Sequence, residues 1–123
     1  MTDRDWTNPE EILSARVLGT VLPCTCGREH RVRTREVAIE YGVADRIPEI
    51  LPDVIPGRRV LLVADKNTLE AAGNRLASAL ASTHSVELCR LPEDASGHIH
   101  ASVELADELD GSFPARYDLI AAV

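Results

Sequence analysis

The chain has 123 residues, a formal net charge of −7, 45% hydrophobic residues and 3% aromatic residues. This length and mixture suit one small globular domain with a core of its own. The negative charge argues against a nucleic-acid partner, the few aromatics argue against a stacking surface for single strands, and no apolar run approaches the ~20 residues of a membrane span.

The first expected element is a short helix that begins at Asn8 and Pro9 and ends at Gly19. Asn8 suits the N-cap, Pro9 suits the first helical position, and the two glutamates that follow favour the positive end of the helix dipole. We expect this helix and the next segment to form one part, residues 1–34. A second part is expected over residues 35–123.

The next segment, Cys24-Thr-Cys-Gly-Arg-Glu-His30, contains two cysteines and a histidine. Three zinc ligands are one interpretation, but Cys-x-Cys is tighter than the usual spacing and a fourth ligand is missing. We favour a Gly-containing turn with reduced thiols between two short extended pieces, and we assign no metal ligand. The chain has three cysteines in all, which do not form a secreted disulfide framework, so we expect a cytoplasmic protein.

Strands and helices are then expected to alternate. Arg35–Tyr41 alternates between apolar and polar residues, which predicts a half-buried strand. A helix follows from about Val43, with apolar residues at helical spacing. Arg58–Ala64 contains an unbroken apolar run, which is typical of a strand buried on both faces of a parallel sheet.

Asp65 follows this buried strand, and a helix follows Asp65. Asn67 and Glu70 stand in the N-cap and N3 relation, and Gly73 is expected to let the helix approach the sheet closely. In doubly wound sheets an acidic residue at a strand's carboxyl end can hold ribose hydroxyls. On spacing alone, however, a solvated loop carboxylate is the plainer interpretation of Asp65.

A strand over Ser85–Leu91 is expected next, with Cys89 as a small core residue. The loop Pro92–Gly97 leads to a helix. We expect His98 and His100 to diverge on that helix as surface imidazoles and not to share a metal. The apolar face of the helix is expected to consist of Ile99, Val103, Ala106 and Leu109.

The final expected strand is Arg116–Val123, and the chain ends inside it. We therefore expect an α/β fold, a Rossmann-like doubly wound parallel sheet with helices on both faces, truncated after the fourth strand. A strand cut short exposes an edge that promotes self-association.

A resemblance to a known family rests on three segments, Ile39–Leu51, Val60–Thr68 and Tyr117–Val123. They resemble the N-terminal nucleotide-binding domain of glycerol-1-phosphate dehydrogenases, which belong to the superfamily of iron-containing alcohol dehydrogenases and dehydroquinate synthase. Cys24–His30 resembles a bacterial branch of this family.

The resemblance implies a cofactor-binding role for Asp65, since the family's aspartate at this point contacts the adenosine ribose of NAD. Asn67 matches the family's polar position beside this aspartate. An alternative role for Asn67 is only to cap the helix. The resemblance also implies a homo-oligomeric parent enzyme of phospholipid metabolism that interconverts glycerol 1-phosphate and dihydroxyacetone phosphate. It further implies that residues 35–123 are a partial NAD-binding domain, and that the parent uses NAD, or NADP, and a divalent metal (Zn, Ni or Fe) in a C-terminal domain outside these residues. These residues include no catalytic group, so we expect an inactive fragment.

Two other functions stay open. A receiver-like signalling domain needs further carboxylates to hold Mg²⁺, whereas Cys89-Arg90-Leu91 ends its strand without one and no lysine lies beyond Lys66. A small non-catalytic α/β binding domain would be expected to end in a polar C-terminus.

Overall fold

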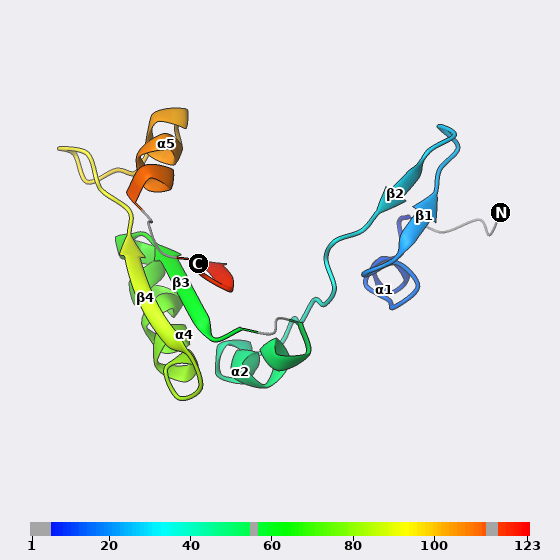
Figure 1. Ribbon diagram of the computed structural model, residues 1–123, viewed down its shortest axis with the longest axis horizontal. Coiled ribbons are helices and arrows are strands. Elements are labelled where there is room, and N and C mark those ends of the chain that lie inside the picture. Colours follow the sequence, from blue (N-terminus) through cyan, green and yellow to red (C-terminus); the bar gives the residue numbers. More distant parts are fainter. Residues whose placement is uncertain (1–5, 55–56, 113–115) are drawn as a thin grey trace. The chain divides into compact units, whose positions relative to one another are not determined.

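The computed structural model describes residues 6–54, 57–112 and 116–123. The chain forms two compact units, Met1–Tyr41 and Gly42–Val123, which are described separately below (Figure 1). Among the described residues, no helix has the length and apolar character needed to cross a membrane.

The first unit begins with helix α1, Pro9–Ile12. The Asn8 side chain accepts a hydrogen bond from the Glu10 N–H at 3.0 Å, which confirms the predicted helix start. The helix ends at Ile12 and not at Gly19. The Ser14 hydroxyl donates to the Glu11 carbonyl at 2.6 Å, and side chains that bond to nearby backbone groups in this way favour turns over continued helix.

A β-hairpin follows, formed by β1, Val21–Pro23, and β2, Glu29–Arg31. The strands are antiparallel, with Leu22 opposite His30. The turn between them is closed by two backbone hydrogen bonds, from the Cys24 N–H to the Arg28 carbonyl and from the Gly27 N–H to the Cys24 carbonyl, both 3.0 Å. Gly27 has φ of +80°, a value that glycine adopts without strain. The predicted Gly-containing turn is therefore confirmed.

The strand predicted over residues 35–41 is wrong. Residues 32–39 have no regular secondary structure, and Val37, Ile39 and Tyr41 are exposed by 40%, 83% and 107%. Alternating apolar residues favour a strand only where a neighbouring strand supplies hydrogen bonds and a core covers one face. In the described residues this segment has neither.

The second unit is an α/β structure around a parallel sheet with the strand order β4-β3-β5. The strands are β3, Arg59–Ala64; β4, Ser85–Arg90; and β5, Leu119–Ala122. The central strand β3 pairs with both neighbours, and Val60, Leu61, Leu62 and Ala64 are at most 1% exposed. The unbroken apolar run thus predicted the buried central strand correctly, and three of the four predicted strands are present in the described sheet.

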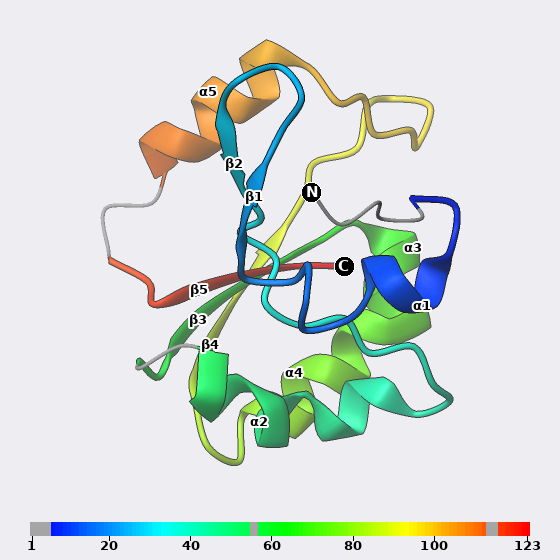
Figure 2. The same ribbon diagram turned by 90° about the vertical axis from the view of Figure 1, so that its right-hand side faces the viewer.

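Helices flank this sheet, as predicted. Helix α2, Val43–Val54, packs against α4, Asn74–Leu80, and both lie on the side of the sheet opposite to α5, Val103–Ser112 (Figure 2). Arg75 on α4 donates two hydrogen bonds to the Asp45 carboxylate on α2, which ties these helices together. The guanidinium of Arg75 lowers the pKa of Asp45 below its usual value.

One continuous helical segment connects β3 to β4. It consists of α3, Lys66–Thr68; a π-helical stretch η1, Leu69–Gly73; and α4. Gly73 is buried, and a Cβ atom there would lie 3.7 Å from the Cβ of Ala64 on β3 and 3.0 Å from Cδ1 of Leu69. The predicted close approach of this helix to the sheet at Gly73 is confirmed.

Candidate functional site

The candidate site is the edge of the sheet where the three parallel strands end. The Leu91 N–H donates to the Ala64 carbonyl at 2.9 Å, and the Val123 N–H donates to the Val63 carbonyl at 3.0 Å. The carboxyl ends of β4 and β5 therefore lie level with the end of β3, and Asp65 follows directly at the centre of this edge.

The order in which the chain connects the strands indicates the same site, the carboxyl end of β3. The chain runs from β3 to β4 on one side of β3 and then crosses to β5 on the other side. Successive crossovers in opposite directions create a topological switch point, and ligands of open α/β sheets bind beside such a point at the carboxyl ends of the strands. Asp65 lies at this switch point.

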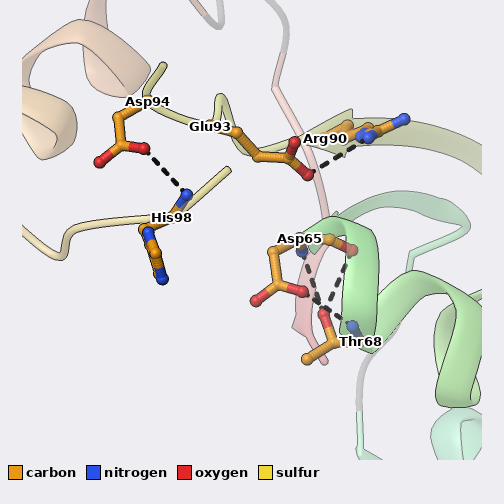
Figure 3. Close-up of polar contacts among 6 residues, drawn as sticks. All are labelled: Asp65, Thr68, Arg90, Glu93, Asp94 and His98. Atoms are coloured by element: carbon orange, nitrogen blue, oxygen red, sulfur yellow. Dashed lines mark hydrogen bonds and ion pairs between the residues drawn. The ribbon is translucent and has the colours of Figure 1, made fainter. Parts of the chain in front are cut away.

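Asp65 is half-buried and forms the N-cap of α3 (Figure 3). Its Oδ1 accepts a hydrogen bond from the Thr68 N–H at 2.8 Å, and the Thr68 hydroxyl accepts one from the Asp65 N–H at 3.0 Å. This is a capping box, with threonine in place of the usual glutamate or glutamine at N3. The second carboxylate oxygen, Oδ2, accepts no hydrogen bond from the described residues and remains able to bind a ligand.

The prediction that Asn67 caps this helix is wrong, because Asn67 lies inside α3 and Asp65 is the cap. The helix begins two residues earlier than predicted, since a carboxylate directly after β3 can bond back to the first helical turn. Asn67 and Lys66 are both exposed. Their exposed positions beside Asp65 place one neutral polar group and one cation near the same strand end.

The loop after β4 contributes a second carboxylate, Asp94. Its Oδ1 accepts hydrogen bonds from the Ser96 hydroxyl at 2.6 Å, the Ser96 N–H at 2.8 Å and the His98 N–H at 2.9 Å. Figure 3 shows the bond from His98. Nε2 of His100 lies 2.9 Å from Oδ2. The Ser96 hydroxyl, with the His98 N–H next, holds the pKa of Asp94 well below its usual value.

The two histidines of this loop are exposed, as predicted, but they do not lie on a helix. Helix α5 begins at Val103, so His98, Ile99 and His100 all precede it. Both histidines converge on Asp94, one through its backbone and one through its ring. The expected divergence on a helix was therefore wrong, and Asp94, which sequence analysis missed, organises the loop.

A pocket of about 240 Å³ lies between the end of β4 and α5. It is lined by Cys89, Arg90 and Pro92 from the β4 side and by Leu105, Glu108, Leu109 and Ser112 from α5. Burial, together with the nearby Glu87 charge, raises the pKa of the Cys89 thiol. Cys89 is only half-buried and lines this pocket, so the prediction that it is a small core residue is wrong. The pocket is smaller than most sites for whole cofactors.

The hairpin of the first unit holds a separate cluster. One ligand atom from each of Cys24, Cys26 and His30 lies within 4.8 Å of the other two. Sγ of Cys26 is 3.2 Å from Nε2 of His30. The pKa of the Cys24 thiol is lowered to about 7, and the largest cause is a hydrogen bond with the Cys26 backbone N–H. The sequence places three possible metal ligands in this segment, and the turn and strand pairing bring them together.

No protein-family model matches the chain. Two curated proteins match part of it, both named glycerol-1-phosphate dehydrogenase (NAD(P)+). The protein of Methanosphaerula palustris is 36% identical over 52 residues, and that of Methanospirillum hungatei JF-1 is 38% identical over 52 residues. Each match covers 42% of this chain but only 14% of the relative. No solved structure matches the chain.

Proposed function

We propose that these residues form part of the cofactor-binding region of an NAD(P)-dependent, metal-dependent dehydrogenase that interconverts glycerol 1-phosphate and dihydroxyacetone phosphate. The observation that carries the proposal is the position of Asp65, a half-buried carboxylate at the switch point of a parallel sheet. The similarity to two proteins named as glycerol-1-phosphate dehydrogenases supports the choice of reaction.

In this proposal Asp65 has two tasks, one for each carboxylate oxygen. Oδ1 caps α3 and fixes the direction of the side chain, while Oδ2 accepts hydrogen bonds from the hydroxyls of the adenosine ribose. A carboxylate anchored at one oxygen loses less side-chain entropy when the other oxygen binds a ligand, which favours binding. Asn67, which is exposed and lies two residues after Asp65, supplies a further polar contact to the same nucleotide.

The hydride of the proposed reaction belongs to the nicotinamide, and a divalent metal polarises the substrate carbonyl. We assign no catalytic residue and no ligand of that metal among these residues, and we expect them to be inactive by themselves. The homo-oligomeric state and the cytoplasmic location that the resemblance and composition imply stay predictions.

A receiver-like signalling function is less well supported by the site. In the order β4-β3-β5, the strand beside Asp65 that would carry the phosphorylated aspartate is β5, which ends in Ala121 and Ala122. A phosphorylation site needs a carboxylate at that position and others nearby to hold Mg²⁺. The aliphatic end of β5 provides none.

Cofactor binding is tested by NMR on the ¹⁵N-labelled chain. We expect AMP and NAD⁺ to shift the amide signals of Asp65, Lys66 and Asn67, because both ligands carry the adenosine ribose. Nicotinamide mononucleotide, which lacks adenosine, should leave these signals unchanged. Equal shifts with all three ligands, or shifts confined to the first unit, would contradict the proposed site.

The reaction is tested with the polypeptide as its natural gene encodes it, purified and supplied with Zn²⁺, Ni²⁺ or Fe²⁺. We expect NADH to be consumed with dihydroxyacetone phosphate, and NAD⁺ to be reduced with glycerol 1-phosphate but not with its mirror image, glycerol 3-phosphate. If AMP and NAD⁺ shift the amide signals as expected but this activity is absent, the nucleotide site is supported and the proposed substrate is wrong.

A further inference from the structure

The cluster of Cys24, Cys26 and His30 lies in the first unit, apart from the strand ends on which the proposed function rests. We propose that these three residues bind one zinc ion, with the fourth coordination position open to solution. The proposal departs from the sequence-based expectation, which assigned no metal ligand to this segment. It rests on the distances between the three side chains and on the hairpin that holds them.

The distances suit a tetrahedral ion. With Zn–S bonds of about 2.3 Å and Zn–N bonds of about 2.0 Å, tetrahedral geometry places two sulfurs about 3.8 Å apart and sulfur and nitrogen about 3.6 Å apart. The ligand atoms of the cluster all lie within 4.8 Å of one another, and Sγ of Cys26 is 3.2 Å from Nε2 of His30. The present distances therefore differ from those of a tetrahedral site by about 1 Å or less.

The backbone that carries the ligands is fixed by the hairpin itself. Cys24 follows β1, Cys26 precedes the positive-φ residue Gly27, and His30 is the central residue of β2. The pairing of Leu22 with His30 and the hydrogen bond from the Cys24 N–H to the Arg28 carbonyl set the register. Because Leu22 is 7% exposed, slippage by one residue would expose it and is disfavoured.

The chemistry of the ligands selects the metal. Two thiolates and one imidazole favour zinc over hard cations such as Mg²⁺ and Ca²⁺, which prefer oxygen ligands. Two thiolates also balance the charge of a divalent ion. The part of the chain that the structure describes contributes three residues to the cluster, and Cys26 and His30 are exposed. Water or an external ligand can therefore fill the fourth position, as in zinc sites that are not closed by protein.

The test uses the chain as it is, purified without metal and kept reduced with a phosphine that does not bind zinc. Cobalt(II), which takes tetrahedral sites like zinc, serves as the spectroscopic probe. We expect one equivalent of Co²⁺ to produce thiolate-to-cobalt charge-transfer absorption, and one equivalent of Zn²⁺ to abolish it. Absence of this absorption, or saturation only at many equivalents, would overturn the proposal.

Variants identify the ligands. Cys24→Ser, Cys26→Ser and His30→Ala should each weaken zinc binding on the order of a hundredfold or more, because even the loss of an outer-shell partner costs ten- to a hundredfold. Cys89→Ser and His84→Ala, which alter the same residue types in the second unit, are the controls and should leave the affinity unchanged. Equal losses in the controls, or full binding in all three ligand variants, would reject the site.

A measurement on the unmodified chain keeps the test independent of variant folding. Zinc should shift the ¹⁵N–¹H signals of residues 22–31 and leave the strand-end residues of β3, β4 and β5 unchanged. Shifts centred on Asp65 or on the Asp94 loop would assign the zinc to a different place and overturn the proposal. Such shifts would leave the proposed nucleotide site to be judged by its own titration with AMP.

Discussion

Asp65 and Thr68 cap each other's backbone at the carboxyl end of β3. The Thr68 N–H donates to Oδ1 of Asp65 at 2.8 Å, and the Asp65 N–H donates to the Thr68 hydroxyl at 3.0 Å. The pair joins the end of the buried central strand to the start of the next helix, and it leaves Oδ2 of Asp65 for a ligand. The same residue is therefore part of the fold and part of the candidate site.

Stability measurements can test the capping of α3 by Asp65 separately from its proposed role in ribose binding. Asp65→Ala should lower the free energy of unfolding by about 0.5–2 kcal/mol, because it leaves first-turn N–H groups unpaired. Thr68→Val, which keeps the shape of the side chain and removes its hydroxyl, should cost about 1 kcal/mol for the lost hydrogen bond. Asn67→Ala is the control and should change stability by less than about 0.5 kcal/mol. Urea denaturation measures all three, and a larger loss in Asn67→Ala would mean that Asn67 has a structural role.

The charge of Asp65 should set the preference between the two cofactors. A carboxylate beside the ribose repels the 2′-phosphate of NADP, so we expect the natural polypeptide to prefer NAD, with Lys66 softening the repulsion. Asp65→Ser keeps a good N-cap residue and removes the charge. We expect the ratio of kcat/KM values to shift toward NADP by about ten- to a hundredfold, as for a charged hydrogen bond of about 1.5–3 kcal/mol.

Steady-state kinetics with both cofactors measures this shift. Asn67→Ala is the matched control, since it removes a neutral side chain and should weaken both cofactors alike without altering their ratio. If Asp65→Ser left the ratio unchanged, Asp65 would not face the ribose, and its role would be limited to the capping of α3.

Gly57 should be intolerant of any side chain. A Cβ atom at this position would collide with Cγ of Asp118, whose Oδ2 accepts a hydrogen bond from the Arg59 N–H at 2.8 Å. Gly57→Ala should therefore displace Asp118 and destabilise the protein by about 1–3 kcal/mol. Gly111→Ala is the control, because a Cβ there meets nothing within 4 Å and alanine in helix α5 should stabilise by up to about 1 kcal/mol. Thermal denaturation of both variants would show opposite shifts; a destabilisation of equal size in both would contradict this explanation.

The Asp94 loop should keep its structure down to unusually low pH. The Ser96 hydroxyl and then the His98 N–H lower the pKa of Asp94 in the folded state. A depressed folded-state pKa gives a stabilising contribution that is fully present above the unfolded value, about 3.9, and is lost as the pH falls through the folded value. We therefore expect the loop to be unchanged above about pH 4 and to loosen only in stronger acid.

An NMR titration of the Asp94 side-chain carbonyl carbon measures this directly. Its midpoint should lie below the usual aspartate value of about 3.9. In Ser96→Ala, which removes the largest cause of the shift, the midpoint should move up toward the usual value. A midpoint near 4 in the unmodified chain would show that the hydrogen bonds to Asp94 do not persist in solution.

Features that depend only on neighbouring residues could be predicted from the sequence. The apolar run Val60–Ala64 predicted the buried central strand, and Asp65 was correctly placed at its carboxyl end. The helix start at Asn8 and the turn at Gly27 were also predictable, because capping and positive φ are properties of a few consecutive residues. The parallel α/β fold followed from the alternation of strands and helices.

Features that depend on how segments of the chain pack together could not be predicted in this way. The alternating segment 35–41 does not form a strand, since alternation supplies no neighbour for its backbone hydrogen bonds. Asp94 is a different case, because its partners Ser96, His98 and His100 lie only two to six residues further along the chain. An aspartate that bonds to the backbone two residues on is a common turn pattern, and this local signal was overlooked. Cys24, Cys26 and His30 converge because strand pairing sets the distance between the turn and β2, and that distance is not a property of residue spacing.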